Sequence, residues 1–140
     1  MTKKLKIKTM ATVKLINYEE ASLEVQAVFD DIKMTRNVVD VNNFWKALAN
    51  QPDNLKRVWQ SVKDVMGNGE IDAMTKEMIY IAVSIINNCD YCIHTHTAAA
   101  KTKGMTDGQY QELLAVIALA STTNAFANGL KVPVDMPFLK

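Results

Sequence analysis

The sequence is poor in residues that form tight turns, since its 140 residues include only five glycines and three prolines. An all-β fold requires many such turns, so this scarcity argues against that fold class. Hydrophobic residues make up 49% of the chain, which is enough for a folded core and too much for a disordered protein. The composition therefore predicts a compact, all-α protein.

An excess of charge is also absent, because 16 basic residues are balanced by 15 acidic ones and the net charge is +1. No global field would draw this chain to nucleic acid or to an anionic membrane surface. The longest near-continuous apolar stretch, residues 78–86, is far below the roughly 20 residues that a membrane-spanning helix requires. We therefore expect neither a nucleic-acid partner nor a membrane span.

The chain begins with a lysine-rich segment, and no apolar run of signal-peptide length follows it. Two cysteines three positions apart are a poor disulfide framework for an exported domain, but they suit redox chemistry or metal binding inside a cell. We interpret residues 1–14 as a basic N-terminal tail, residues 15–140 as a single domain and the protein as cytoplasmic. Residues 67–69, Gly-Asn-Gly, are the best candidate for a hinge.

Apolar residues at helical spacing predict helices that begin near residues 22, 43, 52, 73, 89 and 106, followed by an extended tail over residues 132–137. The helix over residues 73–86 is apolar almost all round, which indicates a central position. Glu77 is the exception, because it places a carboxylate in this otherwise largely apolar helix. A buried carboxylate must be paired, hydrogen-bonded or protonated, whereas one in an exposed first turn only complements the helix dipole.

Both cysteines and both histidines lie between residues 89 and 96. Asn87 and Asn88 can end one helix and cap the next, which places Cys89 and Cys92 in a first helical turn. Unpaired amide groups and the macrodipole favour the thiolate there, so both cysteines are candidate nucleophiles.

At 100° per residue Cys89, Cys92 and His96 fall within about 60° of one another, whereas His94 points elsewhere and suits a surface or a subunit contact. If the two helices fold into an antiparallel hairpin, Glu77 and His96 lie roughly 15 and 13 Å below the turn, at about the same level. The spacing thus predicts that Glu77 orients the His96 imidazole, which takes the proton of Cys92 while Cys89 closes a disulfide. This combination is typical of a thiol peroxidase or a dithiol reductase.

The pattern E-x11-C-x-x-C-x-x-x-H, formed by Glu77, Cys89, Cys92 and His96, resembles the AhpD-like alkylhydroperoxidase group of the carboxymuconolactone decarboxylase superfamily. Further similarity lies in residues 41–49, in residues 76–79 and in the alanine-rich turn before Gly104, so the resemblance covers roughly residues 15–135. It implies an AhpD-like helical bundle whose central antiparallel helix hairpin carries the C-x-x-C motif. It also implies a homo-oligomer, often a trimer or hexamer, without a bound cofactor.

The same resemblance implies that Cys92 attacks a hydroperoxide or a disulfide, Cys89 resolves the intermediate, and Glu77 and His96 form the proton relay. The electron donor would be a thiol reductant of the dihydrolipoyl or thioredoxin type. Tyr91 has a secondary role, because it stands where the best-studied members have a relay histidine, and tyrosine is a poor base near pH 7. This substitution favours general disulfide reduction beside peroxide reduction. The superfamily's decarboxylase activity is disfavoured, since the C-x-x-C pair has no evident role in it.

Two other interpretations remain open at this point. Cys89, Cys92 and His96 could bind zinc in a structural or regulatory site, although His94 faces away and a fourth ligand would have to come from elsewhere. Alternatively, the cysteines are buried in a non-catalytic helical assembly.

The last helix, which Thr106 and Gln109 open as a capping box, is too apolar for a free surface. It either lies across the hairpin or packs against another subunit.

Overall fold

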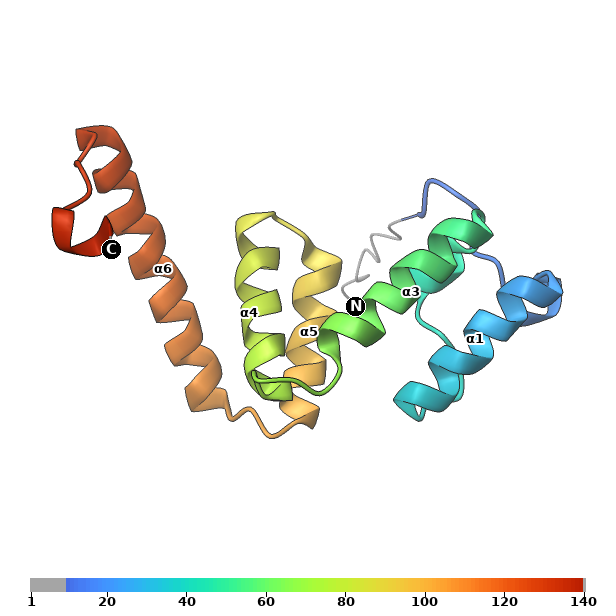
Figure 1. The fold of residues 1–140 in the computed structure, drawn as a ribbon. Coiled ribbons are helices and arrows are strands. Elements are labelled where there is room, and N and C mark those ends of the chain that lie inside the picture. The colour runs from blue at the N-terminus through green and yellow to red at the C-terminus, as the bar shows by residue number, and fades with distance from the viewer. Residues whose placement is uncertain (1–9, 140) are drawn as a thin grey trace, which may run out of the picture. The chain divides into compact units, whose positions relative to one another are not determined.

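A computed structural model of the chain describes residues 10–139. The regular structure in this range is entirely helical, which confirms the predicted all-α class (Figure 1). In chain order the helices are α1 (Leu23–Arg36), α2 (Asn43–Leu48), α3 (Pro52–Met66), α4 (Ala73–Ile86), α5 (Asp90–Thr102) and α6 (Asp107–Leu130). Two short 3-10 turns, η1 (Tyr18–Glu20) and η2 (Met136–Leu139), lie outside these helices.

Local signals position the helix ends largely as expected. The Ser22 hydroxyl accepts a hydrogen bond from the Val25 amide and caps α1. Thr106 and Gln109 form the predicted capping box at the start of α6. The expectation of a fully extended tail was wrong in part, because the Phe138 amide donates to the Asp135 carbonyl and closes the 3-10 turn η2.

The chain divides into two compact units, Met1–Gly67 and Asn68–Lys140. The division falls within the Gly-Asn-Gly segment at residues 67–69. The assignment of residues 1–14 to a tail and of residues 15–140 to a single domain stays a prediction, and residues 1–9 lie outside the described range.

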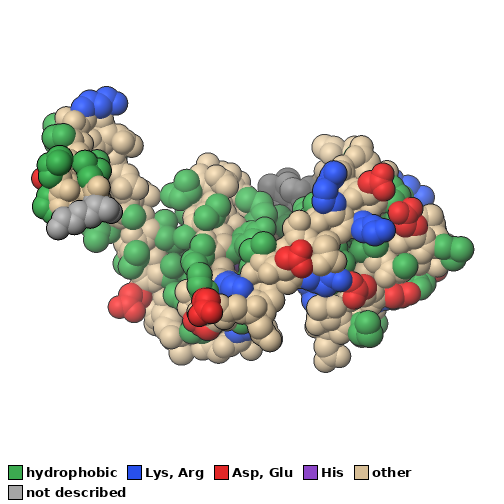
Figure 2. Space-filling view, viewed as in Figure 1, with side chains coloured by type: hydrophobic (Ala, Val, Ile, Leu, Met, Phe, Trp, Pro, Cys, Tyr) green, Lys and Arg blue, Asp and Glu red, His purple; other side chains and the backbone are tan. Residues whose placement is uncertain are grey.

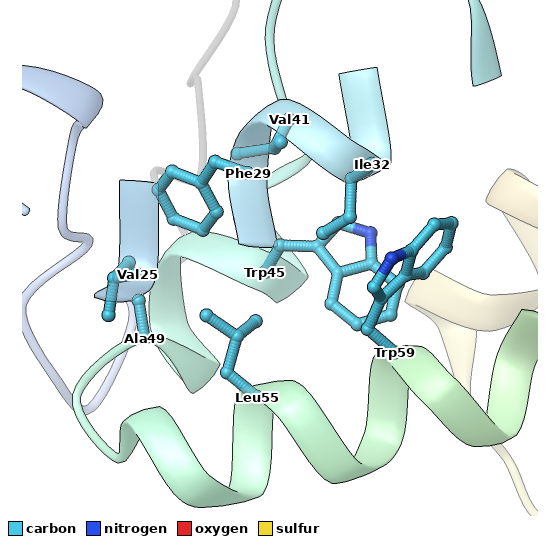
Figure 3. Packing of buried hydrophobic residues seen from close by; sticks show 8 residues of the cluster. All are labelled: Val25, Phe29, Ile32, Val41, Trp45, Ala49, Leu55 and Trp59. Atoms are coloured by element: carbon cyan, nitrogen blue, oxygen red, sulfur yellow. The ribbon is translucent and has the colours of Figure 1, made fainter. Parts of the chain in front are cut away.

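The first unit is built around an aromatic core in which α1, α2 and α3 pack together (Figure 3). The rings of Trp45 and Trp59 meet edge to face, with centroids 5.4 Å apart. Phe29 and Leu55 are fully buried beside them. The buried members of this core are Val25, Phe29, Ile32, Val41, Trp45, Ala49, Leu55 and Trp59. Since each aromatic ring buries a large apolar area, the three aromatic residues contribute strongly to this unit's hydrophobic stabilisation.

The second unit is organised around the antiparallel pair α4 and α5, and α4 also contacts α6 (Figure 1). The turn between α4 and α5 is sharp because Asn88 has φ of 54°, a left-handed conformation that asparagine tolerates better than most residues. Gly104, after α5, has φ of 101°, where a side chain would be strained. The buried core is small and consists of Ile81, Ala100 and Met105, with partly buried side chains from α4 and α6 around it.

Helix α4 contacts both α5 and α6, in agreement with its predicted central position, but it is not buried on every side. Its inward face carries the buried residues Glu77, Ile81 and Ser84. The apolar residues Ile79, Val83 and Ile86 follow one another on another side of α4, and their exposed fractions are 49%, 53% and 61%. Helix α4 therefore has two apolar sides, and this chain covers one of them.

Helix α6 is even more exposed. Tyr110 and Leu113, near its start, pack against the core of the unit, but every residue from Ala118 to Leu130 is exposed. Figure 2 shows the hydrophobic side chains spread over α4 and α6. By length and composition alone α6 would also be able to cross a membrane, a possibility that the apolar stretch at residues 78–86 did not indicate. The expectation of no membrane span stays a prediction.

Candidate functional site

The candidate site begins at the turn between α4 and α5, where Cys89 and Cys92 are joined by a disulfide. Cys89 itself is the N-cap of α5, and its sulfur accepts a hydrogen bond of 3.3 Å from the Cys92 amide. The expectation that Asn87 or Asn88 caps this helix was wrong. The physical reason is that Asn88 is used for the left-handed turn, and the Cys89 amide donates to the Ser84 carbonyl at 3.0 Å, which leaves the cap position to Cys89.

Glu77 and His96 are in direct contact, as their equal distances from the turn predicted. The His96 Nδ1 atom lies 2.6 Å from Glu77 Oε2. An ionised carboxylate only accepts hydrogen bonds, so this contact places the imidazole hydrogen on Nδ1. The lone pair of a neutral His96 then lies on Nε2, which can accept a proton from elsewhere.

His96 follows Cys92 by one turn of α5, so the two side chains are neighbours on the helix surface. Glu77 contacts the imidazole from α4. The structure thus places a carboxylate, an imidazole and a disulfide-bonded cysteine pair in the same α4–α5 hairpin, from residues 77, 89, 92 and 96.

The Glu77 carboxylate has a second partner, since Lys103 Nζ donates to its Oε1 at 2.9 Å. The Glu77 side chain is only 8% exposed, whereas that of Lys103 is 37% exposed. Burial raises the pKa of Glu77, but the hydrogen bonds from His96 and Lys103 and the Lys103 charge outweigh it. The net pKa of Glu77 is below its ordinary value, so this carboxylate stays ionised at neutral pH although it is buried.

Tyr80 forms one wall of the site. Its ring stacks on the His96 imidazole, with centroids 3.6 Å apart and planes 18° from parallel. The stacking fixes the plane of the imidazole, and the bond to Glu77 fixes its rotation within that plane. His96 is therefore held in one orientation by two contacts from α4.

Tyr91 and His94 lie on the outer side of α5. Tyr91 is 42% exposed, and His94 is exposed as well, in agreement with its predicted separation from the other site residues. Among the residues that the structure describes, no group of three or more histidine, cysteine, aspartate and glutamate side chains has the arrangement of a metal site. The two sulfurs of the predicted zinc ligand set are bonded to each other instead.

Sequence reasoning missed two residues of this site, Tyr80 and Lys103. Tyr80 comes one turn after Glu77 and so shares its face of α4, while Lys103 comes two turns after His96 and shares its face of α5. These spacings were available in the sequence. They gave no clear signal because a tyrosine in an apolar helix and a lysine at a helix C-terminus are both common for other reasons.

One open depression, of about 270 Å³, lies in the first unit between α1 and α3. Its lining includes Glu24, Asp31, Lys56 and Lys63 but none of the predicted site residues. The predicted site residues all lie in the second unit.

Comparisons with known proteins bear on the same segment of the chain. The sequence profile of the carboxymuconolactone decarboxylase family matches residues 52–135, which contain every residue of the site. A crystal structure of the alkylhydroperoxidase AhpD core from Rhodospirillum rubrum superposes with a TM-score of 0.89. That match is 54% identical in sequence and covers 94% of this chain and 99% of the other.

Curated relatives are more distant. An alkyl hydroperoxide reductase AhpD from Maricaulis maris is 28% identical over 86% of this chain and 68% of its own length. An uncharacterised protein in the cox locus of Paracoccus denitrificans is 33% identical over 49% of this chain. The matched part spans 62% of that relative. The match to the family profile covers more than half of the sequence, and so this chain belongs to the carboxymuconolactone decarboxylase family and, within it, is similar to the proteins named AhpD.

Proposed function

We propose that this protein is a thiol-dependent peroxidase and disulfide oxidoreductase of the AhpD-like type. Cys92 is the attacking residue, Cys89 resolves, and Glu77 and His96 form the proton relay. The observation that carries the proposal is the 2.6 Å contact between Glu77 and the imidazole that neighbours the cysteine pair. A carboxylate that orients an imidazole beside a nucleophile is a general arrangement for activating that nucleophile.

In the reduced protein the Nε2 atom of His96 accepts the proton of the Cys92 thiol. The thiolate attacks the outer oxygen of a hydroperoxide ROOH, the O–O bond breaks, and Cys92 becomes a sulfenic acid. The proton held by His96 passes to the departing alkoxide, which leaves as ROH. The Cys89 thiol then attacks the Cys92 sulfur, which forms the disulfide and releases water.

A dithiol reductant completes the cycle by thiol–disulfide exchange, in which it becomes a disulfide and restores both cysteines as thiols. The overall reaction is ROOH plus a dithiol to give ROH, water and a disulfide. We propose a reductant of the dihydrolipoyl or thioredoxin type and a cytoplasmic location, where such reductants keep thiols reduced. In disulfide reduction Cys92 attacks a substrate disulfide and releases one substrate thiol, and Cys89 then releases the other and closes the Cys89–Cys92 disulfide, which the same reductant reopens. The site therefore supports that activity too, with Tyr91 in place of a further base.

We also propose that the protein is a homo-oligomer, a trimer or a hexamer. The apolar side of α4 (Ile79, Val83 and Ile86) and an apolar stripe along α6 are both exposed. The α6 stripe consists of Val116, Leu119, Phe126 and Leu130, whose exposed fractions run from 59% to 73%. Successive residues of each set are three, four or seven positions apart. This spacing places them on one face of their helix, as in helices that pack against one another. Exposed apolar side chains that share a helix face are typical of surfaces that bind another protein or another copy of the chain.

The activity is tested by the consumption of an organic hydroperoxide in the presence of a dithiol. We expect Cys92→Ser to abolish turnover, and Cys89→Ser to allow a single stoichiometric oxidation of Cys92. His96→Ala and His94→Ala form a matched pair of imidazole deletions on the two sides of α5, and only the former is expected to slow the reaction. Full turnover by Cys92→Ser would refute the assignment of the attacking residue.

Measurements on the same purified protein distinguish the redox proposal from a zinc site, a structural cysteine pair and a decarboxylase. Tightly bound zinc in metal analysis, together with thiols protected from titration, would favour the metal-binding alternative. Thiols that neither titrate nor oxidise would favour a structural pair. Turnover of a lactone substrate that persists in Cys89→Ser and Cys92→Ser would favour a decarboxylase. The redox proposal requires that both cysteines cycle between the dithiol and the disulfide.

A further inference from the structure

The buried carboxylate of Glu77 is shared between two nitrogen donors, one on each oxygen. Oε2 is 2.6 Å from the His96 ring, and Oε1 accepts from the Lys103 ammonium at 2.9 Å. Lys103 is the C-cap residue of α5, and its side chain reaches from the partly exposed end of the helix into the site. The relay motif itself, residues 77, 89, 92 and 96, does not include it.

Without Lys103, Glu77 would be a nearly buried negative charge beside a single imidazole. Such a charge is costly to desolvate, and the imidazole would compensate it by binding a proton and becoming a cation. An imidazolium has no lone pair to accept a further proton. A relay of carboxylate and imidazole alone would therefore favour the protonated imidazole, which is not a base.

The Lys103 ammonium removes this tendency, because Glu77 and Lys103 together are neutral. We propose that Lys103 is a positioning residue, whose ammonium anchors and neutralises Glu77 so that this carboxylate orients His96 as a neutral base toward Cys92. The lysine touches neither the substrate nor the sulfur, and it acts through Glu77. Its role in catalysis rests on the proposed function, whereas its effect on the titration of His96 does not.

The other groups around His96 do not duplicate this effect. From α4, Glu77 and the stacked Tyr80 ring both favour the imidazolium, the former by its charge and the latter by a cation–π contact. From α6, Tyr110 packs against the cluster that contains Ala100. Lys101, which precedes Lys103 by two residues on α5, forms an ion pair with Asp107 at 2.8 Å. Lys103 is thus a cation that opposes protonation of His96 from within its ion-pair network.

The test is an NMR titration of the His96 ring in the disulfide form, in which no thiol titrates. We expect the midpoint in Lys103→Met to lie about one pH unit above that of the wild type, the size expected for a unit charge a few ångströms away in a partly solvated site. Lys103→Gln, which can keep a hydrogen bond but not the charge, should shift as Lys103→Met does. Lys103→Arg should restore the wild-type midpoint.

Lys101→Met is the matched control. It removes the same charge from the same end of α5, and we expect it to leave the His96 midpoint within about 0.2 pH units because its partner is the exposed Asp107. Two outcomes would overturn the inference. In one, the His96 midpoint is the same in Lys103→Met, Lys103→Gln and wild type. In the other, Lys103→Arg or Lys101→Met shifts it as far as Lys103→Met does.

A kinetic measurement then tests the consequence for catalysis. In single-turnover oxidation of the reduced protein, we expect Lys103→Met to be about fivefold slower than wild type at neutral pH and to recover at higher pH, where His96 is again neutral. A rate loss that is independent of pH would contradict the positioning role. A shifted NMR midpoint in a protein that never consumes hydroperoxide would refute the proposed function but support the inference about Lys103.

Discussion

The two units of the chain each hold an acidic residue whose carboxylate bonds to side chains from a neighbouring helix, and the comparison distinguishes a structural role from a chemical one. In the first unit Asp31 accepts from the Trp59 ring nitrogen at 2.7 Å and from Lys63 at 2.6 Å. Its side chain is 35% exposed, and none of its partners is a histidine. In the second unit Glu77 is 8% exposed, and one of its partners is a histidine. Asp31 is suited to stabilising a fold, whereas Glu77 is suited to directing a proton.

The units also differ in how much of their apolar surface they cover themselves. The first unit buries two tryptophans and a phenylalanine among three helices. The second has a buried core of three residues and leaves apolar sides of α4 and α6 in water. The first unit therefore has the larger buried core, whereas the exposed apolar sides of α4 and α6 in the second are the basis of the proposed oligomer. The following predictions test these contrasts, beginning with the largest expected effect.

The aromatic core of the first unit should be most sensitive to truncation. Phe29 is fully buried, so we expect Phe29→Ala to lower the free energy of unfolding by about 3–5 kcal/mol. Leu23→Ala, at a position that is 85% exposed on the same helix, should stay within about 0.5 kcal/mol of wild type. Urea denaturation followed by tryptophan fluorescence measures both, and similar losses in the two variants would contradict the packing described for this core.

Replacing Glu77 and Asp31 in turn by the corresponding neutral amide should distinguish a role in catalysis from a role in stability. We expect Glu77→Gln to lower the rate of hydroperoxide reduction by about 100-fold, because His96 loses the group that orients it. Asp31→Asn removes an equally well-bonded carboxylate from the other unit, and we expect its rate to stay within about twofold of wild type. Steady-state kinetics at saturating reductant measure the difference. Equal losses would mean that both carboxylates act only through stability.

The exposed stripe of α6 should control assembly. A lysine in place of Leu119, which is 65% exposed in the single chain, should weaken self-association by at least about tenfold, because a charge would be buried in an apolar interface. Leu23→Lys, on α1, is the control for an added surface lysine. Sedimentation at micromolar concentration measures both, and a wild-type protein that is monomeric there would refute the proposed oligomer.

Acid should destabilise the protein partly through Glu77. Because its pKa is depressed in the folded protein, the carboxylate stabilises the fold above its ordinary value of 4.5, and this contribution is lost as the pH falls through the lower folded value. We expect thermal unfolding of Glu77→Gln to depend less on pH than that of wild type between about pH 6 and about pH 3.5. An unchanged pH dependence would contradict the ion pairs of Glu77. This is the smallest of the expected effects.

Much of this fold could be predicted because its signals are local. Helical periodicity, the caps at Ser22 and Thr106 and the break at Gly67 are each decided by neighbouring residues. The contact between Glu77 and His96 was also predictable, since a hairpin of known rise per residue brings equal distances from its turn to the same level.

The remaining features could not be predicted because, at each of them, the same sequence pattern is compatible with more than one arrangement. Asn88 was expected to cap α5, but it takes the left-handed turn, and the cap passes to Cys89. Lys103 gave no signal because a lysine at a helix end ordinarily faces solvent. The exposed side of α4 was missed because an apolar pattern shows that a side is to be buried and not whether the same chain or another copy will cover it.

The central claim is that an imidazole held by Glu77 activates Cys92, and single-turnover kinetics test it most directly. The reduced protein is mixed with an organic hydroperoxide, and the loss of the Cys92 thiol is followed in wild type, His96→Ala and His94→Ala. We expect His96→Ala to be at least about 100-fold slower and His94→Ala to stay within about twofold of wild type. Equal rates in all three proteins would contradict the relay.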